Sequence, residues 1–324
     1  MNKRALKALA GAAAVAVALA GCASEGETPG GNTPEEKPYV ALISKGFRHQ
    51  FWQAVKAGAE QAGKEFNVTV TFEGAQEEGN VEQQIQLLQT VLDKKPDAVG
   101  FAAIDSQAAG PLMQQAKTDN IPVIAFDSGV DSDVPVTTAS TDNLAAAAEA
   151  AKHMADLIGH SGKIAMVVHD QTSVTGVQRR DGFVDYMKKN EPNITIVDIQ
   201  YSGDPLKATD LAKAMIAANP DLKGLYGSNE GAAIGIVHAV QELGIEGKLK
   251  VIGFDSGKDQ IDAITSGLMA GAITQNPVGI GYETVKAAVA IIKGQTVPKN
   301  IDTGFYWYDK TNIEDPKIAA VLYQ

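Results

Sequence analysis

The stretch Val123-Ile-Ala-Phe-Asp-Ser-Gly129 returns later in the chain as Val251-Ile-Gly-Phe-Asp-Ser-Gly257. Each copy is an apolar run that ends in Asp-Ser-Gly, which is typical of a buried strand followed by a turn. Two further matches recur at nearly the same spacing: Pro96-Asp97 and Asp105 with Pro220-Asp221 and Asn229, and Val40 and Gly58 with Ile164 and Gly182. Three matches at nearly one spacing indicate two copies of one structural unit.

Around these copies, apolar runs rich in β-branched residues alternate with segments of helical period. The expected strands are 39–44, 68–72, 98–103, 123–126, 163–168, 194–199, 222–226 and 250–254. The expected helices include 51–66, 80–94 and 144–158, the last behind a cap at Asp142 or Asn143. This alternation predicts an α/β fold of two similar doubly wound lobes, each with a parallel sheet covered by helices on both faces.

The gross composition agrees with a globular protein of about two domains. The chain has 324 residues, of which 44% are hydrophobic and 21% charged, and one hydrophobic core rarely grows that large. The formal net charge is −11, and the sequence has no concentrated stripe of Lys and Arg. Nucleic acid is therefore not expected as a partner, because phosphate binding needs such a basic surface.

The amino-terminal segment has the pattern of a targeting signal. Three cations lie within residues 2–7, a short apolar run covers 8–20, and Leu-Ala-Gly-Cys stands at 19–22. The pattern resembles a bacterial lipoprotein signal with its lipobox, which implies cleavage before Cys22 and a lipid on that thiol. An ordinary secretory signal with an incidental cysteine is the alternative.

This interpretation places two segments before the folded part of the chain. Residues 1–21 are the expected signal peptide, and 22–38, rich in Glu, Gly, Thr and Pro, form an expected flexible tether. Acyl chains on Cys22 would hold the protein at the extracytoplasmic face of the cell membrane. Cys22 is the only cysteine of the sequence, which excludes a disulfide within the chain and a cysteine-zinc site.

Polar residues cluster where the expected strands end, and in open α/β sheets ligands bind beyond those carboxyl ends. The positions are Lys45 to Trp52, Asp105, Asp127, His169, Asp170, Asn229 and Asp255. Two lobes with facing carboxyl edges would form a ligand cleft between them.

The sequence gives little support to an enzyme. It contains no G-x-x-x-x-G-K-[ST], no G-x-G-x-x-G after a strand, no G-x-S-x-G and no H-E-x-x-H. The five histidines lack metal-ligand spacing, so we expect no catalytic residue, cofactor or metal site. A glycosidase that uses Asp127 and Asp255 as acid and base is the enzymatic alternative.

The residue types at the strand ends suit a sugar. Hydroxyl groups donate and accept, so planar Asp, Asn, Gln and Arg groups hold them well, and the C–H faces of the ring favour an aromatic surface. Phe51 and Trp52 would supply that surface, while His49, with Lys45 or Arg48, reaches hydroxyls at the rim. The alternatives are a core pair for Phe51 and Trp52 and a solvent-facing Arg48.

Eight stretches stand in a characteristic order along the chain: Phe51-Trp52, 122–127, 141–143, 179–183, 219–221, 227–230, 251–255 and 271–275. With these stretches, residues 39–310 resemble the sugar-specific, ribose-binding-protein-like class of type 1 periplasmic binding proteins, the substrate-binding proteins of ABC importers.

This resemblance implies the ligand contacts. They are Phe51, Trp52, Asp127, Asn229, Asp255 and Gln275, with Arg179 matching the arginine before Asp-Gly-Phe and His49 standing where family members often have an amide. Lys45, Asp105 and Asp142 are further candidates. Ser128 replaces an arginine of the ribose binders and Ala102 replaces an amide, so ribose itself is not implied.

The resemblance also implies a three-segment hinge near 138–142, 275–277 and 303–306. The lobes would then comprise 39–140 with 276–304, and 141–275 with 305–324.

The expected function is that of a lipid-anchored receptor, a monomer, which delivers a monosaccharide or related polyol to the permease of an ABC importer. A nucleoside-binding or furanosyl-signal-binding lipoprotein of the same fold is the alternative. Because Lys45 and Arg48 are positively charged, an acidic sugar is a further alternative for the ligand. A transcriptional repressor of similar core would need an amino-terminal helix-turn-helix, where this chain has a signal.

Overall fold

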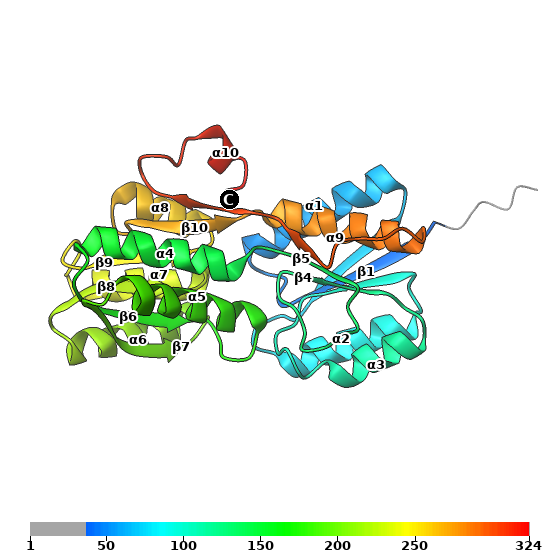
Figure 1. The fold of residues 1–324 in the computed structure, drawn as a ribbon, viewed down its shortest axis with the longest axis horizontal. Helices are drawn as coiled ribbons and strands as arrows, with labels where there is room; N and C mark the ends of the chain where they lie inside the picture. Colours follow the sequence, from blue (N-terminus) through cyan, green and yellow to red (C-terminus); the bar gives the residue numbers. More distant parts are fainter. Residues whose placement is uncertain (1–36, 324) are drawn as a thin grey trace, which may run out of the picture. The chain divides into compact units, whose positions relative to one another are not determined.

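The computed structural model describes residues 37–323, in which the two predicted parallel sheets are both present (Figure 1). The predicted signal 1–21, the lipidation site Cys22 and nearly all of the tether 22–38 lie outside the described residues. None of the helices within 37–323 combines the length and the apolar character that crossing a membrane requires.

The first sheet has six strands, all parallel. They are β1 (Tyr39–Ser44), β2 (Thr69–Gly74), β3 (Ala98–Phe101), β4 (Val123–Phe126), β5 (Thr137–Ser140) and β11 (Asn300–Asp302). Their spatial order is β11-β5-β4-β3-β1-β2. Strand β1 therefore lies where the order reverses, which is the point at which ligands bind in such sheets.

The second sheet repeats this arrangement. Its strands are β6 (Gly162–Val168), β7 (Ile194–Tyr201), β8 (Leu222–Gly227), β9 (Lys250–Phe254), β10 (Gly271–Gln275) and β12 (Phe305–Tyr308). The order is β12-β10-β9-β8-β6-β7, so β6 takes the place that β1 has in the first sheet. Only the pairing of β12 with β10 is antiparallel among these described strands.

Helices cover both faces of each sheet. They are α1 (Gln50–Phe66), α2 (Val81–Asp93), α3 (Gly110–Thr118), α4 (Asn143–Ile158), α5 (Val174–Asn190), α6 (Pro205–Ala218), α7 (Glu230–Glu242), α8 (Lys258–Ser266), α9 (Pro277–Ile292) and α10 (Pro316–Ala319). Successive side chains of β1 point to opposite faces: Val40 and Leu42 pack in the core with α1 and α9, and Ala41 and Ile43 with α2 and α3.

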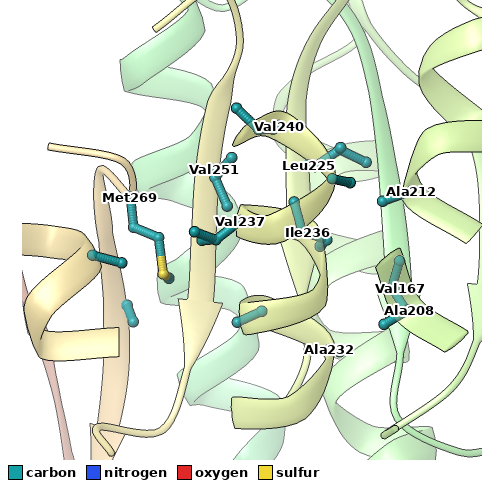
Figure 2. Packing of buried hydrophobic residues seen from close by; sticks show 14 of the residues in the cluster. Val167, Ala208, Ala212, Leu225, Ala232, Ile236, Val237, Val240, Val251 and Met269 are labelled. Atoms are coloured by element: carbon teal, nitrogen blue, oxygen red, sulfur yellow. The ribbon is translucent and has the colours of Figure 1, made fainter. Parts of the chain in front are cut away.

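The core of the second sheet follows the same rule. Ile164 and Met166 of β6 pack with α4 and α5, whereas Ala165 and Val167 pack on the opposite face with α6 and α7. Figure 2 shows the latter cluster, in which side chains of α7 gather with Leu225 of β8, Val251 of β9 and Ala208 and Ala212 of the neighbouring α6. Alternation along buried strands thus produces the two-sided helical cover of the doubly wound fold.

The chain passes between the sheets three times. It leaves the first sheet after β5, returns after β10 through α9, which packs beside α1, and crosses again between β11 and β12 (Figure 1). The two edge strands β11 and β12 therefore come from one short segment near the end of the chain.

Candidate functional site

A cleft lies at the carboxyl ends of the strands, and its walls come from both sheets. The space in and at the mouth of the cleft that protein atoms leave unfilled, open solvent included, is about 410 Å³. Its lining residues are Lys45, His49, Phe51, Trp52, Glu78, Asp127, His169, Thr175, Arg179, Asn229, Glu230, Gly231, Asp255 and Gln275. The structure therefore brings together all eight residues expected as ligand contacts, and Lys45 as well.

Asp127 is a buried acidic residue at the wall of the cleft. It follows β4 in the left-handed backbone conformation (φ 55°), where its own N–H donates to the Ala139 carbonyl at 3.0 Å. No group within residues 37–323 donates to its carboxylate oxygens. Burial raises the pKa of Asp127 to about 6, although the charges of Lys45 and Arg179 oppose the change. The carboxylate can therefore accept hydrogen bonds from a ligand.

Asp255 has the equivalent position after β9 but is held by its neighbours. Its Oδ1 accepts from Gln275 Nε2 at 2.7 Å, and its Oδ2 accepts from the Glu230 N–H at 3.1 Å. The Gln275 Oε1 in turn accepts from the Thr141 hydroxyl at 3.0 Å. These bonds fix the orientation of both the carboxylate and the amide at the wall of the cleft.

Arg179 is buried and is held by residues that surround the second sheet, from Asn143 to Asp255. Its Nε donates to Asn143 Oδ1 at 2.8 Å and its Nη1 donates to the Ser228 carbonyl at 2.9 Å. The guanidinium lies 3.7 Å from the centre of the Phe254 ring, and Nη1 lies 3.8 Å from Asp255 Oδ2. Stacking and two hydrogen bonds fix the position and the orientation of this planar cation in the cleft.

The aromatic pair serves both core and cleft. Phe51 and Trp52 begin α1, are almost fully buried, and meet edge to face with ring centres 4.9 Å apart. The Trp52 indole N–H donates to Glu78 Oε1 at 2.5 Å, which fixes the ring plane. Both side chains also line the cleft. A place in the hydrophobic core and a place at the wall of the cleft, which were expected as alternatives for this pair, are therefore compatible.

Two other predicted residues lie at the starts of helices. His49 is the residue before α1 and makes no capping bond with its side chain. Asn229 caps α7, since its Oδ1 accepts from the Ala232 N–H at 2.9 Å. Capping occupies the oxygen of the Asn229 side chain and fixes its position at the wall of the cleft.

Four side chains of the lining were not among the predicted contacts: Glu78, His169, Thr175 and Glu230. His169 had been noted only as part of the polar cluster at the strand ends, and Glu230 directly follows the predicted Asn229. Glu78 lies in the loop between β2 and α2, where the sequence shows no motif. Thr175 lies in the first turn of α5.

Glu230 is the second carboxyl group of the cleft with a free oxygen. Its Oε2 is fully buried and has no hydrogen-bond partner in the described part of the chain. Burial, and then the negative charge of Asp255, raises the pKa of Glu230 to about 7. A ligand hydroxyl near this oxygen would meet a group that accepts when ionised and can donate when protonated.

The structure does not bring Asp105 and Asp142 into this lining. The Asp105 carboxylate accepts from the Gln107 and Ala108 N–H groups, and the Asp142 carboxylate caps α4 through Ala145. Asp142 borders a second groove, near the chain crossings, which Asp127 also lines. Local turns and caps use oxygens of both Asp105 and Asp142.

No three His, Cys, Asp or Glu side chains within residues 37–323 come together as ligands for a metal ion. What the cleft offers is a set of oriented carboxylates, amides and cations beside two aromatic rings. This set can bind a polar, hydroxyl-rich molecule.

Comparisons with known proteins agree with this geometry. The chain is 27% identical over 267 residues to the D-allose-binding periplasmic protein of Escherichia coli, covering 80% of this chain and 86% of that protein. It is 26% identical over 297 residues to a D-ribose/D-allose-binding protein of Pseudomonas aeruginosa, covering 87% and 91% of the two chains.

Solved structures show the same fold. An ABC transporter solute-binding protein of Agrobacterium vitis, bound to α-D-tagatopyranose, matches with a TM-score of 0.86 and 33% identity over 89% of this chain and 100% of that one. A carbohydrate transporter solute-binding protein of Agrobacterium radiobacter, in complex with D-arabinose, matches with a TM-score of 0.85 and 33% identity over 88% and 99%.

The family model of the periplasmic binding protein domain matches residues 40–296, which include both sheets apart from β11, β12 and the first residue of β1, together with every predicted contact in the cleft. The chain therefore belongs to the periplasmic binding protein domain family.

Proposed function

We propose that this protein is the extracytoplasmic substrate-binding component of an ABC importer, and that it binds a monosaccharide, a pentose or hexose, or a related polyol. The observation that carries the proposal is the cleft, in which Asp127, whose carboxylate accepts no hydrogen bond from residues 37–323, shares the lining with the fixed groups Arg179, Asp255 and Gln275 and with Phe51 and Trp52. Carboxylates, amides and guanidinium groups bridge neighbouring hydroxyls, and aromatic rings cover the C–H faces of a sugar.

The relatives support the ligand class. Their names and bound molecules include D-allose, D-arabinose, α-D-tagatopyranose and D-fucose, all monosaccharides. The family consists of binding proteins, which agrees with a receptor and not with the glycosidase alternative.

Ligand capture would follow from movement of the two lobes. We assign 39–140 and 276–304 to one lobe and 141–275 and 305–324 to the other, with hinges near 138–142, 275–277 and 303–306. A sugar favours the closed form to the extent that it makes contacts with both lobes, and closure removes water from its hydrogen bonds. The closed form is then the one that the permease recognises.

A thermal-shift panel tests the ligand class. The purified protein is heated with pentoses, hexoses, inositols, nucleosides and furanosyl signals, and a ligand at 100 times its Kd adds about 2.7 kcal/mol to the free energy of unfolding. We expect stabilisation by a monosaccharide or polyol. Stabilisation by nucleosides alone would favour the alternative, and turnover of chromogenic glycosides would refute a pure binding role.

The lipid anchor is a further part of the proposal. Cys22 would carry the acyl chains after cleavage of residues 1–21, and the tether would let a monomeric receptor reach the permease. Expression of the full-length protein and of Cys22→Ser in bacteria, followed by membrane fractionation and labelling with a palmitate analogue, tests this. Label on the unsubstituted protein and its loss in the variant are expected.

A further inference from the structure

The Lys45 ammonium is a buried cation in the cleft with unused donors. The residue is 5% exposed, lines the cleft, and its Nζ donates to Thr175 Oγ1 at 3.2 Å. Within residues 37–323 it forms no ion pair and no second side-chain hydrogen bond. An ammonium group has three N–H donors, so two of them have no partner in the described protein.

The bond from Lys45 to Thr175 joins the two halves of the molecule. Lys45 follows β1 of the first sheet, whereas Thr175 lies in α5, which follows β6 of the second sheet. Two further hydrogen bonds join the same halves: the Ser106 N–H donates to the Thr172 carbonyl at 3.1 Å, and the Lys258 N–H donates to Gln50 Oε1 at 3.1 Å. Only the Lys45 bond among these three involves residues that line the cleft.

A chain of hydrogen bonds determines which way the Thr175 hydroxyl points. Ser173 Oγ donates to Asp170 Oδ2 at 2.6 Å and lies 3.1 Å from Thr175 Oγ1. Since the only Ser173 hydroxyl proton goes to Asp170, the proton between the two hydroxyls must come from Thr175. The Thr175 oxygen is then left as an acceptor for the remaining neighbours.

His169 completes this chain on the other side. Its Nε2 lies 3.2 Å from Thr175 Oγ1, and its Nδ1 lies 2.7 Å from Ser228 Oγ, which already accepts the His169 backbone N–H at 2.8 Å. If the proton is on Nε2, this nitrogen donates to Thr175 Oγ1, and the Ser228 hydroxyl donates to Nδ1. Both ring contacts of His169 are then hydrogen bonds. With the proton on Nδ1, the Ser228 hydroxyl proton has no acceptor among the described residues.

The charge state of His169 agrees with this assignment. Burial lowers the pKa of the imidazole well below its ordinary value, and the cations Lys45 and Arg179 lower it further, while Asp170 opposes them. The ring is therefore neutral and can both donate and accept.

We propose that Thr175 and His169 are positioning residues, which hold the Lys45 ammonium across the cleft so that its two remaining N–H groups meet an acceptor oxygen of the ligand. The inference rests on the proposed function and narrows the ligand class. The sugar presents a hydroxyl, carbonyl or ring oxygen to Lys45. A ligand that carries an ammonium group at this position is rejected, because two positive charges would meet. Recognition and closure then depend on the same side chain.

Isosteric variants test the arrangement by calorimetry with the best sugar of the panel. Thr175→Val keeps the shape but removes the acceptor, and we expect it to weaken binding roughly tenfold to a hundredfold, as for a hydrogen bond to a charged group. Thr175→Ser keeps the hydroxyl and should bind within about threefold of the unsubstituted protein. Unchanged melting temperatures of the ligand-free variants show that the fold is intact.

A double-mutant cycle with Lys45→Met separates positioning from mere packing. If Thr175 acts through Lys45, the double variant binds no more weakly than Lys45→Met alone. Losses that simply add, or a Thr175→Val protein that binds like the unsubstituted one, would overturn the proposal.

The hydrogen-bond chain has its own readout, which needs no ligand. Nitrogen-15 NMR of labelled histidine should show His169 as the neutral tautomer protonated at Nε2, with a shift of that nitrogen in Thr175→Val and little change in Thr175→Ser. The Nδ1 tautomer would overturn the arrangement. A protein that binds no sugar at all would instead refute the proposed function, and the tautomer would still decide this inference.

Discussion

Asp127 and Asp255 end equivalent strands in the same left-handed backbone conformation, at φ 55° and 83°, yet protein groups within residues 37–323 donate only to the carboxylate of Asp255. The repeated unit therefore places two carboxylates at one cleft, but their hydrogen-bond partners in the protein differ. Asp255 is oriented by Gln275 and by the backbone of Glu230 before any ligand arrives, while Asp127 keeps its oxygens for the ligand.

This difference predicts unequal effects of alanine at the two positions. Asp127→Ala should weaken sugar binding by about 2 to 4 kcal/mol, because ligand hydroxyls lose their acceptor, and should leave the free energy of urea unfolding within about 1 kcal/mol. Asp255→Ala should weaken binding and also lower the free energy of unfolding by roughly 1 to 3 kcal/mol, since Gln275 and Arg179 lose a buried partner. Equal unfolding curves for the two variants would contradict the assignment.

The raised pKa of Asp127, about 6, predicts pH-dependent binding. A sugar hydroxyl donates to the ionised carboxylate and so lowers this pKa in the complex, which couples binding to loss of a proton. Affinity should be constant at high pH and should fall by up to about tenfold per pH unit as the pH drops through 6. Calorimetry of Asp127→Asn between pH 5 and 8 should show this step removed.

Glu230 provides the control for that experiment. Its pKa of about 7 places a second, separate step at higher pH. Glu230→Gln should lose the upper step and keep the one near pH 6. A pH profile that neither substitution changes would show that these carboxyl groups do not contact the ligand.

The two tryptophans predict a fluorescence signal for binding. Trp52 lines the cleft, whereas Trp307 is stacked on His153 with ring centres 4.0 Å apart and does not line it. Titration with the sugar should change the emission of the unsubstituted protein and of Trp307→Phe, because a ligand in the cleft changes the polar surroundings of the Trp52 ring. The change should vanish in Trp52→Phe. A signal that follows Trp307 instead would place the ligand elsewhere.

Helix packing gives a prediction for stability. A Cβ on Gly58 of α1 would lie 1.9 Å from the Val278 carbonyl oxygen of α9, so Gly58→Ala should lower the free energy of unfolding by more than about 2 kcal/mol. Gly79→Ala, whose Cβ would meet nothing within 4 Å, is the matched control and should change it by less than about 0.5 kcal/mol. Similar urea midpoints for the two variants would contradict the packing.

Much of the fold could be predicted because its determinants are local or repeated. The expected strand 123–126 has the observed bounds of β4, and the matched glycines have matching roles: Gly58 approaches the backbone of Val278, and Gly182 approaches that of Leu144. The short strands β5, β10, β11 and β12 were not predicted as strands. Pairing partners far along the chain create them, and their own sequences carry little of that information.

The site was predictable where function and sequence motif coincide. Asp127 and Asp255 directly follow strands that carry recognisable patterns, so their convergence at one edge followed from the topology, whereas Gln275 was expected only from the family resemblance. Glu78 and Thr175 have no such pattern, because a loop and the first turn of a helix bring them to the cleft through tertiary packing. Asp142 was expected as the cap of the helix that follows it, and this local signal is confirmed.

The short segment that supplies both β11 and β12 also bears on how the chain is made. Neither sheet receives its final edge until residues 300–308 have left the ribosome, and until then β5 and β10 are open edges, a state that invites pairing with other chains. Completion of both sheets therefore waits for residues that follow every other described strand in the chain.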